Sequence, residues 1–140
     1  MLALVTYKKE FAAEDAELDN VLAFIEDSLM MHGCSMKTQM MINVCVEEIF
    51  VNIAHYAYEG MENKGAYIQI DVEGQDATIT FVDSGIEFDP LAKEDPDITA
   101  KAEDRGIGGL GIYMVKKSMD ACKYERKDGQ NIFSITKFIG

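Results

Sequence analysis

The sequence has few basic residues, few cysteines and no apolar run of membrane length. Its 13 Lys and Arg against 25 Asp and Glu give a net charge of −12, which argues against nucleic acid or an anionic membrane as a partner. No apolar run approaches the roughly 20 residues of a membrane-spanning helix, and the N-terminal residues show no signal-peptide cleavage site. Proteins and small molecules remain as partners, and an anionic ligand would need local backbone amides or a metal.

The number and spacing of cysteines and histidines argue against a metal site built from Cys and His ligands. The three cysteines, Cys34, Cys45 and Cys122, are odd in number and lack metal-type spacing, which predicts free thiols in a reducing cytoplasm. His32 and His55 fall in no ligand pattern, so a site built from Cys and His is not expected. With 140 residues, 48% apolar and 27% charged, residues 1–140 are expected to form a single globular domain.

Hydrophobic periodicity and turn residues predict the order β-α-α-β-β-loop-α-β-β. The helices are paired rather than alternating with strands, which predicts an α+β fold of two layers, with helices on one face of a mainly antiparallel, mixed sheet. The expected strands are Leu2–Lys9, Ala66–Glu73, Ala77–Val82, Ala121–Arg126 and Gln130–Ile139, and the expected helices are Glu14–Met31, Met36–Tyr58 and one that opens at Gly106–Gly111 and continues through Met119.

Local signals mark several of these boundaries. Gly33 is well placed to stop the first helix, and Ser35 is expected to be the N-cap of the second. The sequence Lys127-Asp128-Gly129 predicts the turn of a closing hairpin. The apolar face of the first helix is expected to pack on the sheet, although part of it could equally serve as a dimer surface.

The central helix carries two parallel lines of side chains. One is an apolar stripe at helical spacing, formed by Ile42, Val46, Ile49, Ile53 and Tyr56, and it predicts a buried face. Beside it, Glu48 and Asn52 are four residues apart and therefore lie on one helix face. A surface polar stripe would explain this pair, but its place along a hydrophobic stripe suits one wall of a polar site. The neighbouring Glu47 is rotated by about 100° and is expected either to face solvent or to support the site from behind its lining residues.

Two further stretches are candidates for binding. Asp83-Ser84-Gly85 ends a predicted strand, where it is either an ordinary turn or a carboxylate that accepts a hydrogen bond from an amine. Gly106–Gly111 holds four glycines in six positions at the start of a helix, which is either a hinge or a phosphate site built from free amides. It is neither a P-loop nor a dinucleotide fingerprint. The polar loop Glu87–Arg105 between them contains both prolines and could cover a ligand.

The order and spacing of these motifs resemble the GHKL ATPases, which share the histidine-kinase-like ATP-binding fold, and within them the small anti-sigma-factor serine kinases. Glu48-Ile49-Phe50-Val51-Asn52 is similar to the family's first motif. The segment Asp83–Pro90, with its Phe-Asp-Pro, is similar to the second, and Arg105–Ile112 to the third. No phosphoacceptor domain precedes the motifs, which is unlike a sensor histidine kinase. The family often has a His four residues after the Asn; here that position is Tyr56 and His55 lies one earlier, so His55 is expected to be structural or at the rim of the site.

The resemblance implies a function and a role for each residue. It implies ATP and Mg²⁺ as ligands, Glu48 as the base that polarises an attacking serine hydroxyl, and Asn52 as a metal ligand. Asp83 would bind the exocyclic amine of adenine. The other nucleotide-binding residues that the resemblance implies are Gly85, Phe88, Arg105, Gly106, Gly108, Gly109, Leu110 and Gly111. It also implies a sigma factor and a STAS-type anti-sigma-factor antagonist as partners, and a possible homodimer.

Two other functions stay open on the sequence alone. One is an ATP-binding module that sequesters a regulator without transferring phosphate, and an intact Glu48 counts against it. The other is an α+β interaction domain without a nucleotide, in which the motifs would be coincidental.

Overall fold

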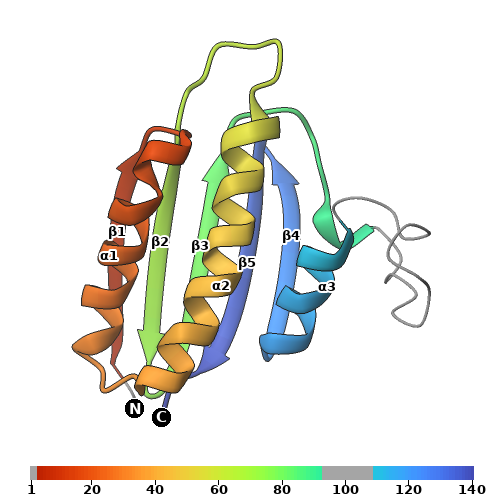
Figure 1. The fold of residues 1–140 in the computed structure, drawn as a ribbon. Helices are drawn as coiled ribbons and strands as arrows, with labels where there is room; N and C mark the ends of the chain where they lie inside the picture. The colour runs from red at the N-terminus through yellow and green to blue at the C-terminus, as the bar shows by residue number, and fades with distance from the viewer. Residues whose placement is uncertain (1–2, 93–108) are drawn as a thin grey trace.

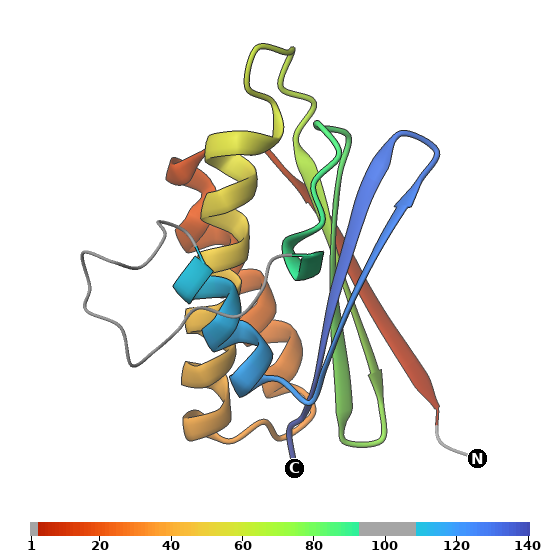
Figure 2. The same ribbon diagram turned by 90° about the vertical axis from the view of Figure 1, so that its right-hand side faces the viewer.

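The computed structural model describes residues 3–92 and 109–140 as two layers, with three helices on one face of a five-stranded sheet. Figure 1 shows the helices in front of the sheet, and Figure 2 shows the two layers edge-on. The predicted order of elements and the α+β architecture are therefore confirmed.

The sheet has the order β1-β2-β3-β5-β4, and every pairing among the described strands is antiparallel. The expectation of a mixed sheet is wrong on this point: β3 and β4, which are connected through α3, run parallel, but β5 lies between them and pairs antiparallel with both. The strands are β1 (Leu4–Phe11), β2 (Ala66–Glu73), β3 (Asp76–Asp83), β4 (Ala121–Lys127) and β5 (Gln130–Phe138). The hairpin between β4 and β5 turns at Asp128 and Gly129, which both have positive φ, as a two-residue turn of this type requires.

The helical layer consists of α1 (Leu18–Met30), α2 (Met36–Asn52) and α3 (Gly109–Ser118), and α2 lies between the other two (Figure 1). A single 3-10 turn, Asp15–Glu17, precedes α1, and another, Pro90–Ala92, follows the loop after β3. The predicted face of α1 packs into the core through Val21, Ile25 and Leu29. None of the helices within the described ranges has the length and apolar content to cross a membrane.

The N-cap of α2 is the one the sequence predicts. The side-chain Oγ of Ser35 accepts a hydrogen bond from the backbone N–H of Thr38 at 3.2 Å. We expect Ser35→Ala to lower the free energy of unfolding by about 1 kcal/mol, because one amide at the start of α2 loses its partner. Urea unfolding measures this change. Ser35→Gly is the control, with an expected loss of a few tenths of a kcal/mol; an alanine variant as stable as the wild type would contradict the cap.

Helix α2 continues into a π-helical turn, Ile53–Ala57, that the sequence did not predict. Because the π-turn holds one more residue per hydrogen-bonded ring than an α-helix, it shifts the phase of the side chains that follow. Tyr56, expected in the buried stripe, is 59% exposed, whereas Ala57 and Tyr58 are buried in its place. The first three residues of the predicted stripe, Ile42, Val46 and Ile49, are buried as expected.

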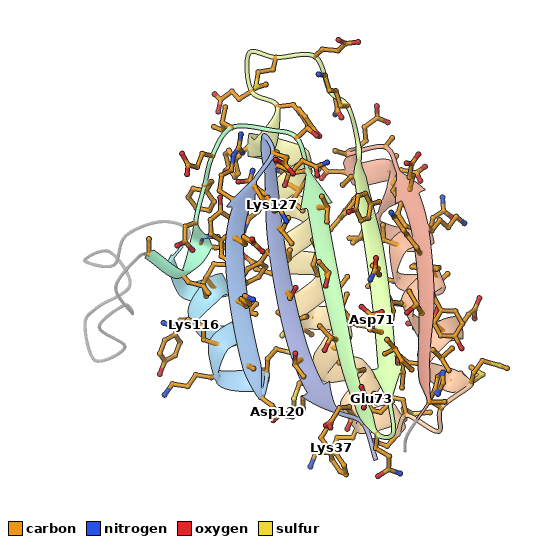
Figure 3. The ribbon with its side chains drawn as sticks, turned by 180° about the vertical axis from the view of Figure 1, so that it is seen from behind. Lys37, Asp71, Glu73, Lys116, Asp120 and Lys127 are labelled. Carbon is orange, nitrogen blue, oxygen red and sulfur yellow. The ribbon has the colours of Figure 1, made fainter. Side chains whose placement is uncertain are left out.

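The sheet face away from the helices is polar (Figure 3). Its side chains bond to one another across strands: Thr78 to Thr136 at 3.1 Å, and Thr80 to Ser134 at 2.9 Å. Asp71, labelled in Figure 3, accepts a hydrogen bond from Thr6 on β1. The face is thus an ordinary solvated side of an antiparallel sheet.

The two ends of the described chain lie at one end of the sheet (Figure 1). Leu4 pairs with Glu73 and Phe138 pairs with Asp76, where β3 begins. Asp83 pairs with Asn131 at the opposite end, where β3 stops. The sequence motifs around Asp83 are therefore separated from the termini by the length of a strand.

Candidate functional site

A cavity of about 270 Å³ opens beside the end of β3, between α2, α3 and the β4–β5 hairpin. Its walls are mainly apolar, and its polar side chains come from four different elements. The lining residues are Ile49, Asn52, Ile53, Tyr56, Ala57, Phe81, Asp83, Ile86, Phe88, Pro90, Ile112, Tyr124, Asn131 and Phe133. A concave apolar site with few convergent polar groups is the usual form of a small-molecule site.

Asp83 is the most buried carboxylate of this site, with 5% of its surface exposed. Its Oδ1 accepts hydrogen bonds from the backbone N–H of Gly85 and from Nδ2 of Asn131, each at 2.9 Å. Both hydrogen bonds that the Asp83 carboxylate accepts from described residues are therefore accepted by Oδ1. Its second oxygen, Oδ2, accepts no hydrogen bond from residues 3–92 or 109–140, and a ligand in the cavity could donate to it.

The glycine after Asp83 packs against the π-turn. A Cβ atom added at Gly85 would lie 2.1 Å from the backbone oxygen of Ala57, so only glycine fits here. The next residue, Ile86, donates its N–H to the same oxygen at 2.8 Å. The motif resemblance implied that Gly85 binds the nucleotide. Gly85 is not among the residues that line the cavity, and its contact with Ala57 joins the second motif to the end of the first.

Tyr58 supports this junction from the other side. Its hydroxyl donates to the backbone oxygen of Gly65 and accepts from the N–H of Ser84 at 2.8 Å. Burial raises the pKa of Tyr58, so the phenol keeps the proton that it donates. The end of the π-turn is thus tied to both β2 and β3 beside Asp83.

Asn52 and Glu48 lie on one line of α2, as predicted, but they face different surroundings. Asn52 lines the cavity. Glu48 does not, and its half-buried side chain lies against α3: a Cβ added at Gly111 would be 2.0 Å from Oε1 of Glu48. Glu47 is exposed, which is one of the two placements expected for it.

The third motif is only partly within the described residues. Gly109, Leu110 and Gly111 form the first turn of α3, where backbone N–H groups lack partners within the helix. The positive end of the helix dipole therefore lies next to the Glu48 carboxylate. The predictions for Arg105, Gly106 and Gly108, and for most of the loop Glu87–Arg105, fall outside the described residues.

Phe88 and Tyr56 border the mouth of the cavity. Their exposed fractions are 51% and 59%, so two large rings stand at its rim without being covered. His55 is not among the residues that line the cavity, and its Nε2 lies 2.7 Å from Oδ2 of Asp15. The pair that His55 forms with Asp15 is exposed, and the expectation of a structural or rim histidine stays a prediction.

The sequence analysis missed three polar residues at the site, all on the β4–β5 hairpin. Asn131 and Tyr124 line the cavity, and Arg126 donates to the backbone oxygen of Gly85 at 2.9 Å. Burial raises the pKa of Tyr124, and the nearby Glu87 carboxylate raises it further. Asn131 could have been noticed, because it occupies an inward position of a strand whose other inward residues are apolar, such as Phe133 and Ile135.

The chain matches a known family and is similar to several named proteins. Residues 11–137 match the family described as "Histidine kinase-like ATPase domain". The chain is similar to serine/threonine-protein kinase BtrW of Bordetella bronchiseptica, with 21% identity over 117 residues, 84% of this chain and 82% of BtrW. It is also similar to serine-protein kinase RsbW of Listeria monocytogenes, with 24% identity over 102 residues, 70% of this chain and 64% of RsbW.

Solved structures share the fold at low identity. The crystal structure of the RsbU and RsbW domains of Rv1364c from Mycobacterium tuberculosis has a TM-score of 0.68 and 13% identity, covering 95% of this chain and 32% of that one. The SiaB–SiaC complex from Pseudomonas aeruginosa gives a TM-score of 0.59 and 16% identity, covering 94% of this chain and 88% of the other. These likenesses establish the two-layer arrangement described above.

Proposed function

This chain belongs to the histidine kinase-like ATPase domain family, and on that premise we propose that it binds ATP and transfers the γ-phosphoryl group to a serine of a partner protein. The main support is the placement of three motif residues on described elements. Asp83 and Asn52 share one apolar cavity, and Glu48 lies beside the first turn of α3. The relatives named above as serine kinases agree with this reaction class.

The base of the nucleotide would enter the cavity. Oδ2 of Asp83 would accept a hydrogen bond from the exocyclic amine of adenine, while the exposed rings of Tyr56 and Phe88 would cover the base. Gly85 would act indirectly by holding Asp83 against the π-turn. The cavity volume of about 270 Å³ is enough for the base, and the phosphates would extend toward α3.

The phosphates would lie at the start of α3. Gly109, Leu110 and Gly111 would offer backbone amides there, and Arg105, Gly106 and Gly108 are proposed to contribute from the preceding segment. Asn52 presents a neutral side-chain oxygen of the kind that Mg²⁺ accepts alongside phosphate oxygens and water. When bound, Mg²⁺ would neutralise the charge on the phosphates.

Glu48 would serve as the base. The serine oxygen attacks the γ-phosphorus, the bond from that phosphorus to the bridging oxygen breaks, ADP leaves, and the hydroxyl proton passes to the Glu48 carboxylate. Following the motif resemblance, the serine would belong to a STAS-type anti-sigma-factor antagonist, and the chain would also sequester a sigma factor. Two copies of the chain could form a homodimer.

A second function is favoured by one observation. Glu48 lies against Gly111 and outside the residues that line the cavity, which would also suit a carboxylate that only stabilises the N-terminus of α3. The chain would then bind ATP and sequester a regulator without transferring phosphate.

Nucleotide binding is tested by thermal unfolding with ATP, with and without Mg²⁺. A ligand at 100 times its Kd stabilises the folded state by about 2.7 kcal/mol, which raises the melting temperature by several degrees. We expect a magnesium-dependent rise in the wild type that Asn52→Ala loses. Asn43→Ala is the matched control, because Asn43 is on the same helix but bonds to Glu26 of α1. The absence of a rise at millimolar ATP would contradict nucleotide binding.

A further inference from the structure

Among the described side chains of the site, Asn131 makes the most hydrogen bonds. It is 7% exposed, and its Nδ2 donates to Oδ1 of Asp83 at 2.9 Å and to the backbone oxygen of Ile86 at 2.7 Å. A primary amide has two N–H protons, so both are used. The amide thus connects the last residue of β3 to the segment that forms one wall of the cavity.

The oxygen of the same amide receives three donors. Oδ1 of Asn131 accepts from the N–H of Phe88 at 3.2 Å, from the hydroxyl of Tyr124 at 2.6 Å and from Nη1 of Arg126 at 3.2 Å. These donors determine which end of the amide is the oxygen and which is the nitrogen, because a flipped amide would place its N–H₂ group against three other donors. The Nδ2 end must therefore face Asp83.

This fixed orientation has a consequence for the carboxylate. Oδ1 of Asp83 faces two donors, the N–H of Gly85 and Nδ2 of Asn131, so it is held as an acceptor and is occupied. The oxygen left for a ligand is then an acceptor only, so the ligand must present a donor. Among purines, the 6-amino group of adenine satisfies that requirement and the 6-oxo group of hypoxanthine does not.

We propose that Asn131 is a positioning residue that sets the base preference of the site by holding Asp83 as an acceptor and by fixing the wall segment Ile86–Phe88. The proposal rests on the proposed function, since it concerns the base of the nucleotide bound there. In this role Asn131 controls the ratio of the affinities for ATP and ITP, whereas a purely structural Asn131 would only stabilise the fold.

The test is calorimetric titration of the full chain with Mg-ATP and with Mg-ITP. We expect the wild type to bind ATP at least about tenfold more tightly, the usual worth of one hydrogen bond to a charged group. In Asn131→Asp two carboxylates would face each other and share a proton, so Asp83 could also donate. The ATP-to-ITP ratio should then fall to within about twofold of unity.

Two further variants complete the design. Gln130→Glu adds the same negative charge one residue away, on the solvated face of β5, and should keep the wild-type ratio. Tyr124→Phe removes one donor to Asn131 without changing charge, and should lower the ratio by about two- to fivefold. If circular dichroism shows that Asn131→Asp does not fold, the ATP-to-ITP ratio of Tyr124→Phe tests whether Asn131 sets the base preference.

The outcomes separate this proposal from the nucleotide site itself. Asn131 would be a structural residue only if Asn131→Asp bound both nucleotides more weakly with an unchanged ratio of ATP to ITP affinity. The same result in Tyr124→Phe would show this if Asn131→Asp did not fold. Equal wild-type affinities for ATP and ITP would overturn the proposal while leaving nucleotide binding intact. A wild type that binds neither nucleotide would overturn the proposed function and this role together.

Discussion

Replacing Glu48 with Gln should slow phosphoryl transfer by a factor of about 100 to 10,000 and leave ATP binding unchanged. The substitution keeps the shape of a side chain that lies against Gly111, but it removes the negative charge and the ability to take a proton. The measurement is the single-turnover rate of transfer from labelled ATP to a candidate antagonist, with nucleotide affinity measured in parallel.

Glu47→Gln is the matched control, because the neighbouring glutamate is exposed and should transfer phosphate at the wild-type rate. The two proposed functions give different results. If Glu48 only stabilises the start of α3, Glu48→Gln should lower the melting temperature and leave any transfer rate unaltered. A normal rate in Glu48→Gln would rule out this residue as the base.

Gly85→Ala should destabilise the protein by about 1–3 kcal/mol and weaken ATP binding as well. The added Cβ would lie 2.1 Å from the backbone oxygen of Ala57, and a backbone atom cannot rotate away as a side chain can. Either β3 or the π-turn must shift, and both carry residues that line the cavity. Urea unfolding measures the loss of stability, and calorimetry measures the loss of affinity.

Gly111→Ala provides the comparison for Gly85→Ala. Its Cβ would meet the flexible end of Glu48 rather than backbone, so the carboxylate can move aside. We expect a small change in stability for Gly111→Ala, but slower phosphoryl transfer. A Gly85→Ala variant as stable as the wild type would show that the junction with Ala57 tolerates a methyl group.

Much of the fold was predictable because its signals are local. The apolar period of α1 and the first part of α2, the Ser35 cap and the Asp128-Gly129 turn all depend on residues close in sequence. The helix pairing then predicted a two-layer arrangement. The three free cysteines also agree with the prediction from their number and spacing.

The contacts that complete the site were not predictable, because each joins residues far apart in sequence. The π-turn Ile53–Ala57 ends in contact with the segment after β3, where Ile86 donates to the backbone oxygen of Ala57. The role of Asn131 depends on the register that places it opposite Asp83. Sequence spacing placed Glu48 and Asn52 on one helix face. It could not show that Gly111 of α3 would lie against Glu48, nor that Asn52 would line the cavity.

The separation of the chain ends from the cavity determines how this protein can be tagged or attached to a surface. Leu4 and Phe138 lie where β3 begins and Asp83 where it ends, seven residue steps apart, or about 24 Å along an antiparallel strand. A fluorescent protein, an affinity tag or a surface linker attached at either terminus would therefore lie at the end of the sheet opposite the cavity. Immobilised by its ends, the protein would present the cavity to solution, which suits a sensor chip on which partners are screened.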